Sequence, residues 1–290
     1  MYIRRTIPFP ATAFLWAPLG LDMTSGRSSR LAGPLCAVFL LAGIIGLGAP
    51  PPAGAQAEGE SGAEEQSVEA RYALERFAMV EVIAYLAART SSETGIAQFD
   101  EHILRAMNKV PRHRFVPDSL RPYAYRNGPL PLGYGQNISQ PFIIALMTHL
   151  IALKPGDVIY ETGTGAGYQA AILAELGARV YSVEIITPLA EPAAARLDRL
   201  GYHMVSVKRG DGYDGWPEHA PYDGILVKEA LNHVPKHLLD QLKPGGRMVL
   251  PLGFQDKQHL TVIEKHPDGN ITKTRVMPVR FSPFQGGDRI

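Results

Sequence analysis

The most constraining feature of this sequence is a strand-like run that passes through a glycine-rich loop into a helical segment. Residues 158–168 are VIYETGTGAGY, with glycine at the alternate positions Gly163, Gly165 and Gly167. Glycine permits positive φ and lets the backbone approach a ligand closely at the carboxyl end of a strand. A tight strand-to-helix turn calls for the same residues, so the loop by itself predicts a local structure and leaves its ligand open.

Short apolar strands alternate with helical segments after this loop. We expect strands at residues 158–160, 179–183, 204–207, 224–227 and 247–251, and helices at 170–176, 189–200 and 235–241. Such alternation predicts an α/β fold with a mostly parallel, Rossmann-like sheet covered on both faces. Residues 259–265 and 274–281 flank a Pro-Asp-Gly-Asn turn signal and predict an antiparallel C-terminal hairpin.

The N-terminal part has the features of an export leader. Arg27 and Arg30 precede the uncharged apolar run 31–49, and an Ala-x-Ala tract ends at Ala57. This order predicts a cleaved signal peptide over residues 1–57 and an exported, periplasmic protein. An uncleaved membrane anchor is the alternative, because the run approaches the ~20 residues that span a bilayer. A leader that does not function would leave the protein in the cytoplasm.

The rest of the chain divides into three expected parts. Residues 58–67 are acidic and polar and predict a disordered linker. Residues 68–150 predict a helical extension on the substrate side, with helices from residue 68 and over 100–109 and with extended chain around the prolines at 111, 117 and 122. Residues 151–290 form the expected core, and we expect a monomer.

Charge and cysteine content exclude several classes of protein. The chain has 29 Lys+Arg and 28 Asp+Glu, and the predicted leader contains four of the arginines but only one acidic residue. The mature part is therefore slightly acidic, so we do not expect nucleic acid as a partner. Cys36, the single cysteine, lies in the leader, which rules out a disulfide or a cysteine-rich zinc site. His233 and His237 lack a nearby carboxylate, so we expect no metal.

Two acidic residues after the next strands indicate what the glycine loop binds. The G-x-G-x-G spacing differs from the dinucleotide pattern and favours S-adenosylmethionine. Glu184 ends the second strand of the core, where a carboxylate can bind a ribose diol, and Asp211 follows the third, where it can accept from an adenine amine. Glu161 is expected to organise the loop by accepting hydrogen bonds from its backbone or from the methionine amine.

Several longer motifs resemble the protein-L-isoaspartate O-methyltransferase family, over about residues 82–283. The most specific are Val-Pro-Arg-His-Arg-Phe-Val-Pro at 110–117 and the block 130–141, which ends in Ile-Ser-Gln-Pro. The glycine loop, Gly-Asp-Gly-Tyr-Asp-Gly-Trp at 210–216, Ala-Pro-Tyr-Asp at 220–223 and Leu-Lys-Pro-Gly-Gly-Arg at 242–247 continue the likeness.

The resemblance implies an S-adenosylmethionine-dependent enzyme that methylates the α-carboxylate of isoaspartyl residues in damaged proteins, a repair reaction. It places Ser139 at the active site, and it maps the cofactor residues to Gly163, Gly165, Gly167, Glu184 and Asp211. From the residues alone, the favoured interpretation of Ser139 is the N-cap of a helix that begins near Pro141, and the resemblance shifts the preference to the active site.

Four residues depart from the family pattern. Lys228 and Glu229 stand where small residues are usual, Thr162 replaces an aliphatic residue, and Asn137 replaces a threonine. The two charges could obstruct the acceptor pocket. An exported, non-catalytic binding protein on the same fold, or a methyltransferase for another acceptor, therefore stays as an alternative.

Overall fold

The computed structural model describes residues 53–286, and the expected leader lies mostly outside them. Helices α1 (Ala53–Arg89), α2 (Ser91–Thr94), α3 (Glu101–Lys109) and α4 (Pro141–Ile151) precede the core. The core helices are α5 (Tyr168–Glu175), α6 (Thr187–Arg199) and α7 (Lys236–Gln241). Its strands are β3 (Val158–Thr162), β4 (Arg179–Glu184), β5 (Val205–Arg209), β6 (Tyr222–Leu226), β7 (Leu242–Leu252), β8 (Gln258–Lys265) and β9 (Ile271–Val279).

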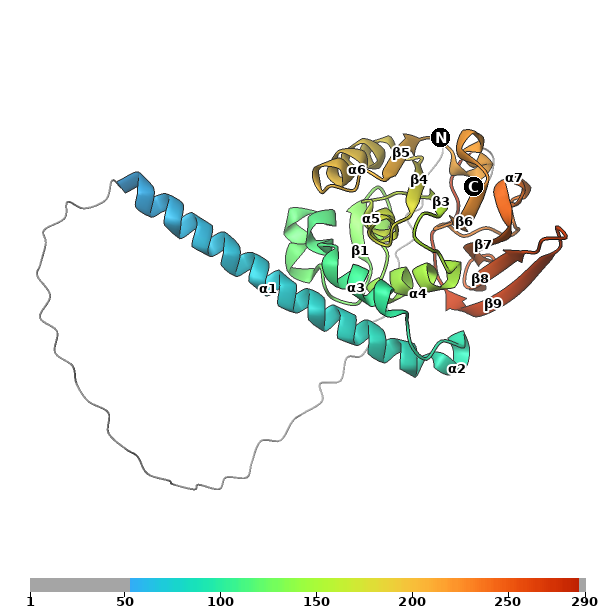
Figure 1. Cartoon of the computed structure of the whole chain (residues 1–290), viewed down its shortest axis with the longest axis horizontal. Coiled ribbons are helices and arrows are strands. Elements are labelled where there is room, and N and C mark those ends of the chain that lie inside the picture. The colour runs from blue at the N-terminus through green and yellow to red at the C-terminus, as the bar shows by residue number, and fades with distance from the viewer. Residues whose placement is uncertain (1–52, 287–290) are drawn as a thin grey trace, which may run out of the picture. The chain divides into compact units, whose positions relative to one another are not determined.

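The core strands form one seven-stranded sheet in the order β5-β4-β3-β6-β7-β8-β9 (Figure 1). The pairs from β5 to β7 are parallel, and the pairs β7–β8 and β8–β9 are antiparallel. The chain crosses from β3 out to β5 and then returns to place β6 on the other side of β3. The predicted Rossmann-like sheet and its antiparallel C-terminal hairpin are confirmed.

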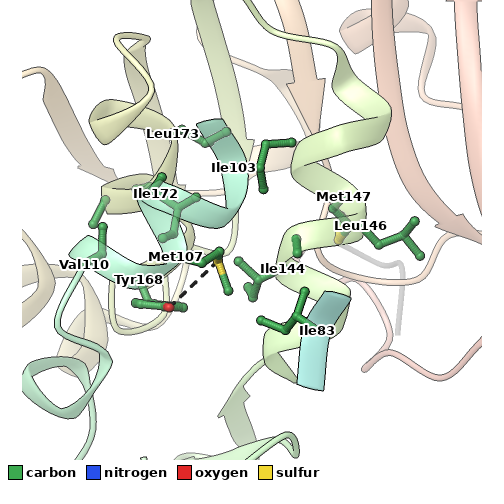
Figure 2. Close-up of a cluster of buried hydrophobic side chains, with 14 of the residues drawn as sticks. Ile83, Ile103, Met107, Val110, Ile144, Leu146, Met147, Tyr168, Ile172 and Leu173 are labelled. Carbon is green, nitrogen blue, oxygen red and sulfur yellow. Dashed lines mark hydrogen bonds between the residues drawn. The ribbon is translucent and has the colours of Figure 1, made fainter. Parts of the chain in front are cut away.

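Alternate side chains of the central strands enter different cores. In β3, Ile159 packs into a large cluster with α1, α3, α4 and α5, whereas the next residue, Tyr160, packs into a second cluster that includes Leu238 of α7. A strand exposes successive side chains on opposite faces, so a sheet buried on both faces needs apolar residues at both. Figure 2 shows the first cluster, in which the Tyr168 hydroxyl contacts the Met107 sulfur at 3.9 Å.

Helix α1 differs from the expectation in two respects. Residues 58–67, predicted to be a disordered linker, are helical, and the predicted leader boundary at Ala57 falls inside the same helix. The glutamates and the glutamine that make this segment polar are also good helix formers. Farther along, Tyr72 and Ile83 are buried, whereas Phe77 is 57% exposed and Tyr85 is 61% exposed.

The proline-rich segment is more ordered than extended chain. Arg112–Phe115 and Asp118–Tyr123 form two 3-10 helices, η1 and η2, where we expected irregular backbone. Pro111 and Pro117 directly precede the two helices as their N-cap residues, and Pro122 lies inside η2, where its fixed φ is close to the helical value. The antiparallel pair β1 (Leu130–Gly133) and β2 (Gln136–Ile138) was not predicted, because a strand of three or four residues carries too little pattern to recognise. The predicted helix at 100–109 is confirmed, with the Asp100 side chain accepting from the His102 amide at 2.7 Å.

Among residues 53–286, no helix has both the length and the apolar content that crossing a bilayer requires.

Replacing Ile83 by alanine tests whether α1 is part of the core. The side chain is fully buried between α1 and the helices of the first cluster, so Ile83→Ala should lower the free energy of unfolding by about 2–4 kcal/mol in urea denaturation. Leu74→Ala is the matched control, because Leu74 on the same helix is 73% exposed and its loss should cost less than about 0.5 kcal/mol. Equal effects of the two substitutions would show that α1 does not pack as described.

Candidate active site

One cavity of about 550 Å³ opens at the carboxyl ends of the central parallel strands. The glycine loop after β3, the end of β4 and the segment after β6 form its floor, and β2 with the start of α4 forms one wall. This is the sheet edge at which open α/β folds bind ligands, where the order of strands reverses. Its volume lies within the range of about 300–1,000 Å³ that small-molecule sites occupy.

The structure gathers four of the seven predicted site residues around this cavity. Ser139, Gly163, Gly165 and Glu184 belong to its lining, which comes from segments far apart in the sequence. Glu161, Gly167 and Asp211 do not line it.

The glycines of the loop are required for two different reasons. All three have positive φ, between 57° and 90°, which other residues adopt only with strain. A Cβ on Gly163 would lie 1.8 Å from Glu229 Oε1, and a Cβ on Gly167 would lie 3.0 Å from a methyl carbon of Leu197. Gly163 therefore admits a neighbouring carboxylate, whereas Gly167 lets α5 and α6 pack closely.

Glu184 fixes the loop through its backbone. Its carboxylate accepts from the Gly165 amide at 2.7 Å and from the Ile186 amide at 2.8 Å, one bond to each oxygen. A carboxylate has about four lone-pair positions, so Glu184 can accept further donors from the cavity, which it lines. Its predicted role toward a ribose diol is compatible with this geometry.

Asp211 lies just outside the cavity. Its side chain accepts from the Tyr213 amide at 3.0 Å and so begins the short helix η3 (Gly212–Asp214). The adjacent Gly212 does line the cavity. Asp211 thus caps a short helix beside the site. Its side chain could contact a ligand only at the edge of the cavity, near Gly212.

Glu161 has partners that the sequence analysis did not foresee. Its carboxylate is completely buried, accepts from the Ser182 hydroxyl at 2.6 Å and pairs with the Lys228 ammonium at 2.7 Å. The Ser182 hydroxyl is bonded in turn to Thr164 Oγ1 at 2.6 Å. We expected Glu161 to accept from loop backbone or from a bound amine, but a lysine of this chain occupies one of its oxygens instead.

Three of the departures from the family pattern form one hydrogen-bonded group. The Thr162 hydroxyl accepts from the Lys228 amide at 3.2 Å and donates to Glu229 Oε2 at 2.6 Å. Burial raises the pKa of Glu229 to about 7, with the neighbouring Glu184 and Glu161 charges adding to the increase, while Thr162 and Lys228 oppose it. An aliphatic residue at position 162 could make neither bond, so Thr162 belongs with Lys228 and Glu229. Asn137 is separate from this group and lines the cavity from β2.

Ser139 is held in place through its backbone. The buried Arg112 guanidinium donates to the Ser139 carbonyl at 2.8 Å and to the Ala124 carbonyl at 2.9 Å, and it stacks 4.8 Å from the centre of the Tyr168 ring. Burial lowers the pKa of Arg112 to about 10, and it stays charged at neutral pH. Arg112 of the Pro-Arg-His-Arg-Phe-Val-Pro motif thus fixes the backbone at Ser139.

The helix-cap interpretation of Ser139 is not what the structure shows. The N-cap of α4 is Gln140, and no side chain of the N-cap residue bonds to the helix. The Phe142 amide instead donates to the Asn127 side-chain oxygen at 3.1 Å. Ser139 is left at the cavity wall.

Several cavity residues had no recognisable signal in the sequence. Leu86 lies near the end of α1 and Thr90 directly follows that helix, and the run 277–285 from β9 onward covers another side. The latter segment is attached to the loop after β6, where Ala230 exchanges backbone hydrogen bonds with Ser282 and Phe284 at 2.8 and 3.0 Å. Long-range closure of this kind cannot be inferred from local pattern.

The histidines considered as metal ligands have other partners. His233 bonds to the Tyr213 hydroxyl at 2.6 Å and to Asn232 at 2.5 Å. Within residues 53–286, no three histidine, cysteine or acidic side chains lie close enough together to hold a metal ion.

The buried pair of Lys228 and Glu161 gives a prediction about stability. Lys228→Met removes the partner of a fully buried carboxylate, and we expect the free energy of unfolding to fall by about 3 kcal/mol. The double variant Lys228→Met/Glu161→Gln leaves no buried charge and should recover much of that loss. Urea denaturation of the two single variants and the double variant measures the coupling, and additive effects would contradict the pairing.

Known sequences match most of this chain. The family model described as protein-L-isoaspartate(D-aspartate) O-methyltransferase (PCMT) matches residues 88–289. Protein-L-isoaspartate O-methyltransferase 1 of Cupriavidus necator is 52% identical over 213 residues, which cover 73% of this chain and 82% of the relative. The protein of the same name from Nitrosospira multiformis is 58% identical over 186 residues, or 64% of this chain and 79% of the relative.

Solved structures agree. A protein-L-isoaspartate O-methyltransferase is 28% identical with a TM-score of 0.60, and the match covers 72% of this chain and 67% of that one. A beta-aspartate methyltransferase (PCMT) structure from Plasmodium falciparum, in complex with S-adenosyl-L-homocysteine, is 21% identical with a TM-score of 0.60 over 72% of this chain and 98% of that one, and supports the fold. With the matching family model and two relatives above half identity, this chain belongs to the protein-L-isoaspartate(D-aspartate) O-methyltransferase family.

Proposed function

We propose that the cavity at the glycine loop is the active site at which this chain transfers a methyl group from S-adenosylmethionine to the α-carboxylate of isoaspartyl residues in damaged proteins. Membership of the family supports the reaction, and the residues around the cavity support its location. The observation that carries the proposal is that Ser139, the glycine loop and Glu184 line one cavity although they come from separate parts of the chain.

The residues around the loop fit the cofactor. Gly165 lines the cavity, and Glu184 retains acceptor capacity beside it. In our assignment Glu184 binds the ribose, Gly163 and Gly165 allow close approach, and Gly167 keeps the loop packed. Asp211 is assigned to the adenine end, at the rim near Gly212. When bound, S-adenosylmethionine supplies an electrophilic methyl group.

The proposed acceptor, an isoaspartyl α-carboxylate, does not need a general base. An isoaspartyl α-carboxylate is already ionised at neutral pH, so no side chain needs to remove a proton. The protein has to align the carboxylate and exclude water, and such positioning accounts for a large part of the rate in reactions of this type. We assign Ser139 to hold the carboxylate by donating its hydroxyl hydrogen, with Arg112 keeping the serine backbone in place.

Lys228 does not support the obstructed-pocket alternative. Lys228 lines the cavity, but its ammonium is paired with the fully buried Glu161 carboxylate at 2.7 Å. A non-catalytic role was considered because two charges stand where small residues are usual, and this pairing neutralises one of them, Lys228.

A methyl-transfer assay tests the proposal. The full chain should transfer label from S-adenosylmethionine to an isoaspartyl peptide and not to its aspartyl isomer. Ser139→Ala should lower kcat/KM for the peptide by about 10- to 100-fold, because a hydrogen bond to a charged group contributes about 1.5–3 kcal/mol. The affinity for S-adenosylmethionine, measured by calorimetry, should change little. Absence of transfer by a folded protein that binds the cofactor would point to another acceptor.

We also propose that the protein is exported. The support is the order of basic residues, apolar run and Ala-x-Ala tract in residues 27–57. Mass spectrometry of the protein from its own cell envelope should find an N-terminus after Ala57. A cytoplasmic protein that retains residues 31–49 would overturn export, and a retained leader in the membrane fraction would favour the anchor.

A further inference from the structure

We propose that Glu229 contacts the sulfonium end of S-adenosylmethionine and thereby makes the site prefer the cationic cofactor over its uncharged-sulfur product, S-adenosylhomocysteine. This inference rests on the proposed function, because it requires the cofactor to lie along the glycine loop. Glu229 would be a cofactor-selecting residue at a position where the family usually has a small residue.

The Glu229 carboxylate lies at the start of the glycine loop. Glu229 lines the cavity, and its Oε1 lies where a side chain on Gly163 would begin, 1.8 Å from the Cβ position. It therefore lies against the first glycine of the loop, whereas Glu184 bonds to the backbone of Gly165, two residues farther along. With the ribose assigned to Glu184, the sulfonium portion falls toward Glu229.

One oxygen of the Glu229 carboxylate is held by a hydrogen bond, and the other has no hydrogen-bond donor among the described residues. Glu229 Oε2 accepts from the Thr162 hydroxyl at 2.6 Å, whereas Oε1 has no hydrogen-bond donor among the described residues. Thr162 is itself fully buried in β3 and is held by the Lys228 amide. A carboxylate fixed at one oxygen and open at the other is suited to a cationic ligand.

The charges around Glu229 indicate which group of a ligand it can contact. An acceptor carboxylate would be repelled by an ionised Glu229 and by Glu184. The cofactor carries two cations, its methionine ammonium and its sulfonium, and the ammonium is common to the cofactor and its product. The sulfonium is the cation that the reaction consumes, so a contact with it distinguishes cofactor from product.

The raised pKa of Glu229 is consistent with this arrangement. The charged groups that act on it are Lys228, Glu184 and Glu161, and burial is the largest influence. Without bound cofactor, a carboxyl with this pKa is partly protonated near neutral pH. A bound cation favours the ionised form, so cofactor binding should release protons and should strengthen as the pH rises through about 7.

The contact also has a predicted kinetic signature. The positive charge on sulfur is lost as the methyl group is transferred, so an anion beside it stabilises the bound cofactor more than the transition state. Removing the anion should raise KM for S-adenosylmethionine without lowering kcat. A residue with only a structural role would not separate the two constants in this way.

Isothermal calorimetry with the full chain tests the inference. We expect Glu229→Gln to weaken S-adenosylmethionine binding by about tenfold or more, as for the loss of one partly buried charge contact. The affinity for S-adenosylhomocysteine should change by less than about threefold, and the pH dependence of the ratio of the two affinities between about pH 6 and 8 should disappear. Glu191→Gln is the matched control, because Glu191 is exposed on α6 and should leave both affinities unchanged.

The outcomes separate this inference from the proposed function. Equal weakening of both ligands would assign the contact to the ammonium that they share and would overturn the inference, as would unchanged or tighter binding of S-adenosylmethionine. Thr162→Val keeps the carboxylate but removes its anchor, and it should lower the preference for S-adenosylmethionine in the same direction. If the wild-type protein bound neither ligand, the proposed function itself would fail.

Discussion

The parallel pairing of β3 with β6 is the constraint on which the site depends. Glu161 lies opposite Leu226 in this register, so the residues that follow both strands emerge side by side at one sheet edge. The chain returns from β5 to β6 across the sheet, and this reversal of strand order creates the crevice. Two segments more than sixty residues apart in the sequence thereby form one site. The hydrogen bond between Thr162 and Glu229 joins them directly.

The same pairing explains how this member of the family accommodates charges after β6. Lys228 is neutralised by Glu161, and Glu229 is oriented by Thr162. Burying a charge without a partner lowers the free energy of unfolding. Lys228 is therefore tolerated because Glu161 pairs with it, and Glu229 is tolerated because Thr162 bonds to it. Glycine at position 163 completes the arrangement, since any side chain there would occupy the place of the Glu229 carboxylate.

The sequence predicted the core well because its signals are local. The strands β3 and β4 and the helix α6 follow from apolar runs of the right length, and the glycine loop identifies the edge that binds a ligand. Its failures have physical causes. Polar residues at 58–67 are compatible with either a helix or a disordered chain, and β1 and β2 are too short to show alternation. Pairings such as Glu161 with Lys228 depend on which strands become neighbours, and a single sequence does not reveal them.

A crystal structure of the full chain with S-adenosylhomocysteine and an isoaspartyl peptide is the most direct test of the account. The account predicts that the ligand lies along Gly163 and Gly165 with its ribose on Glu184, and that the peptide carboxylate bonds to the Ser139 hydroxyl. A nucleoside bound away from the glycine loop, or a peptide carboxylate held without Ser139, would contradict it.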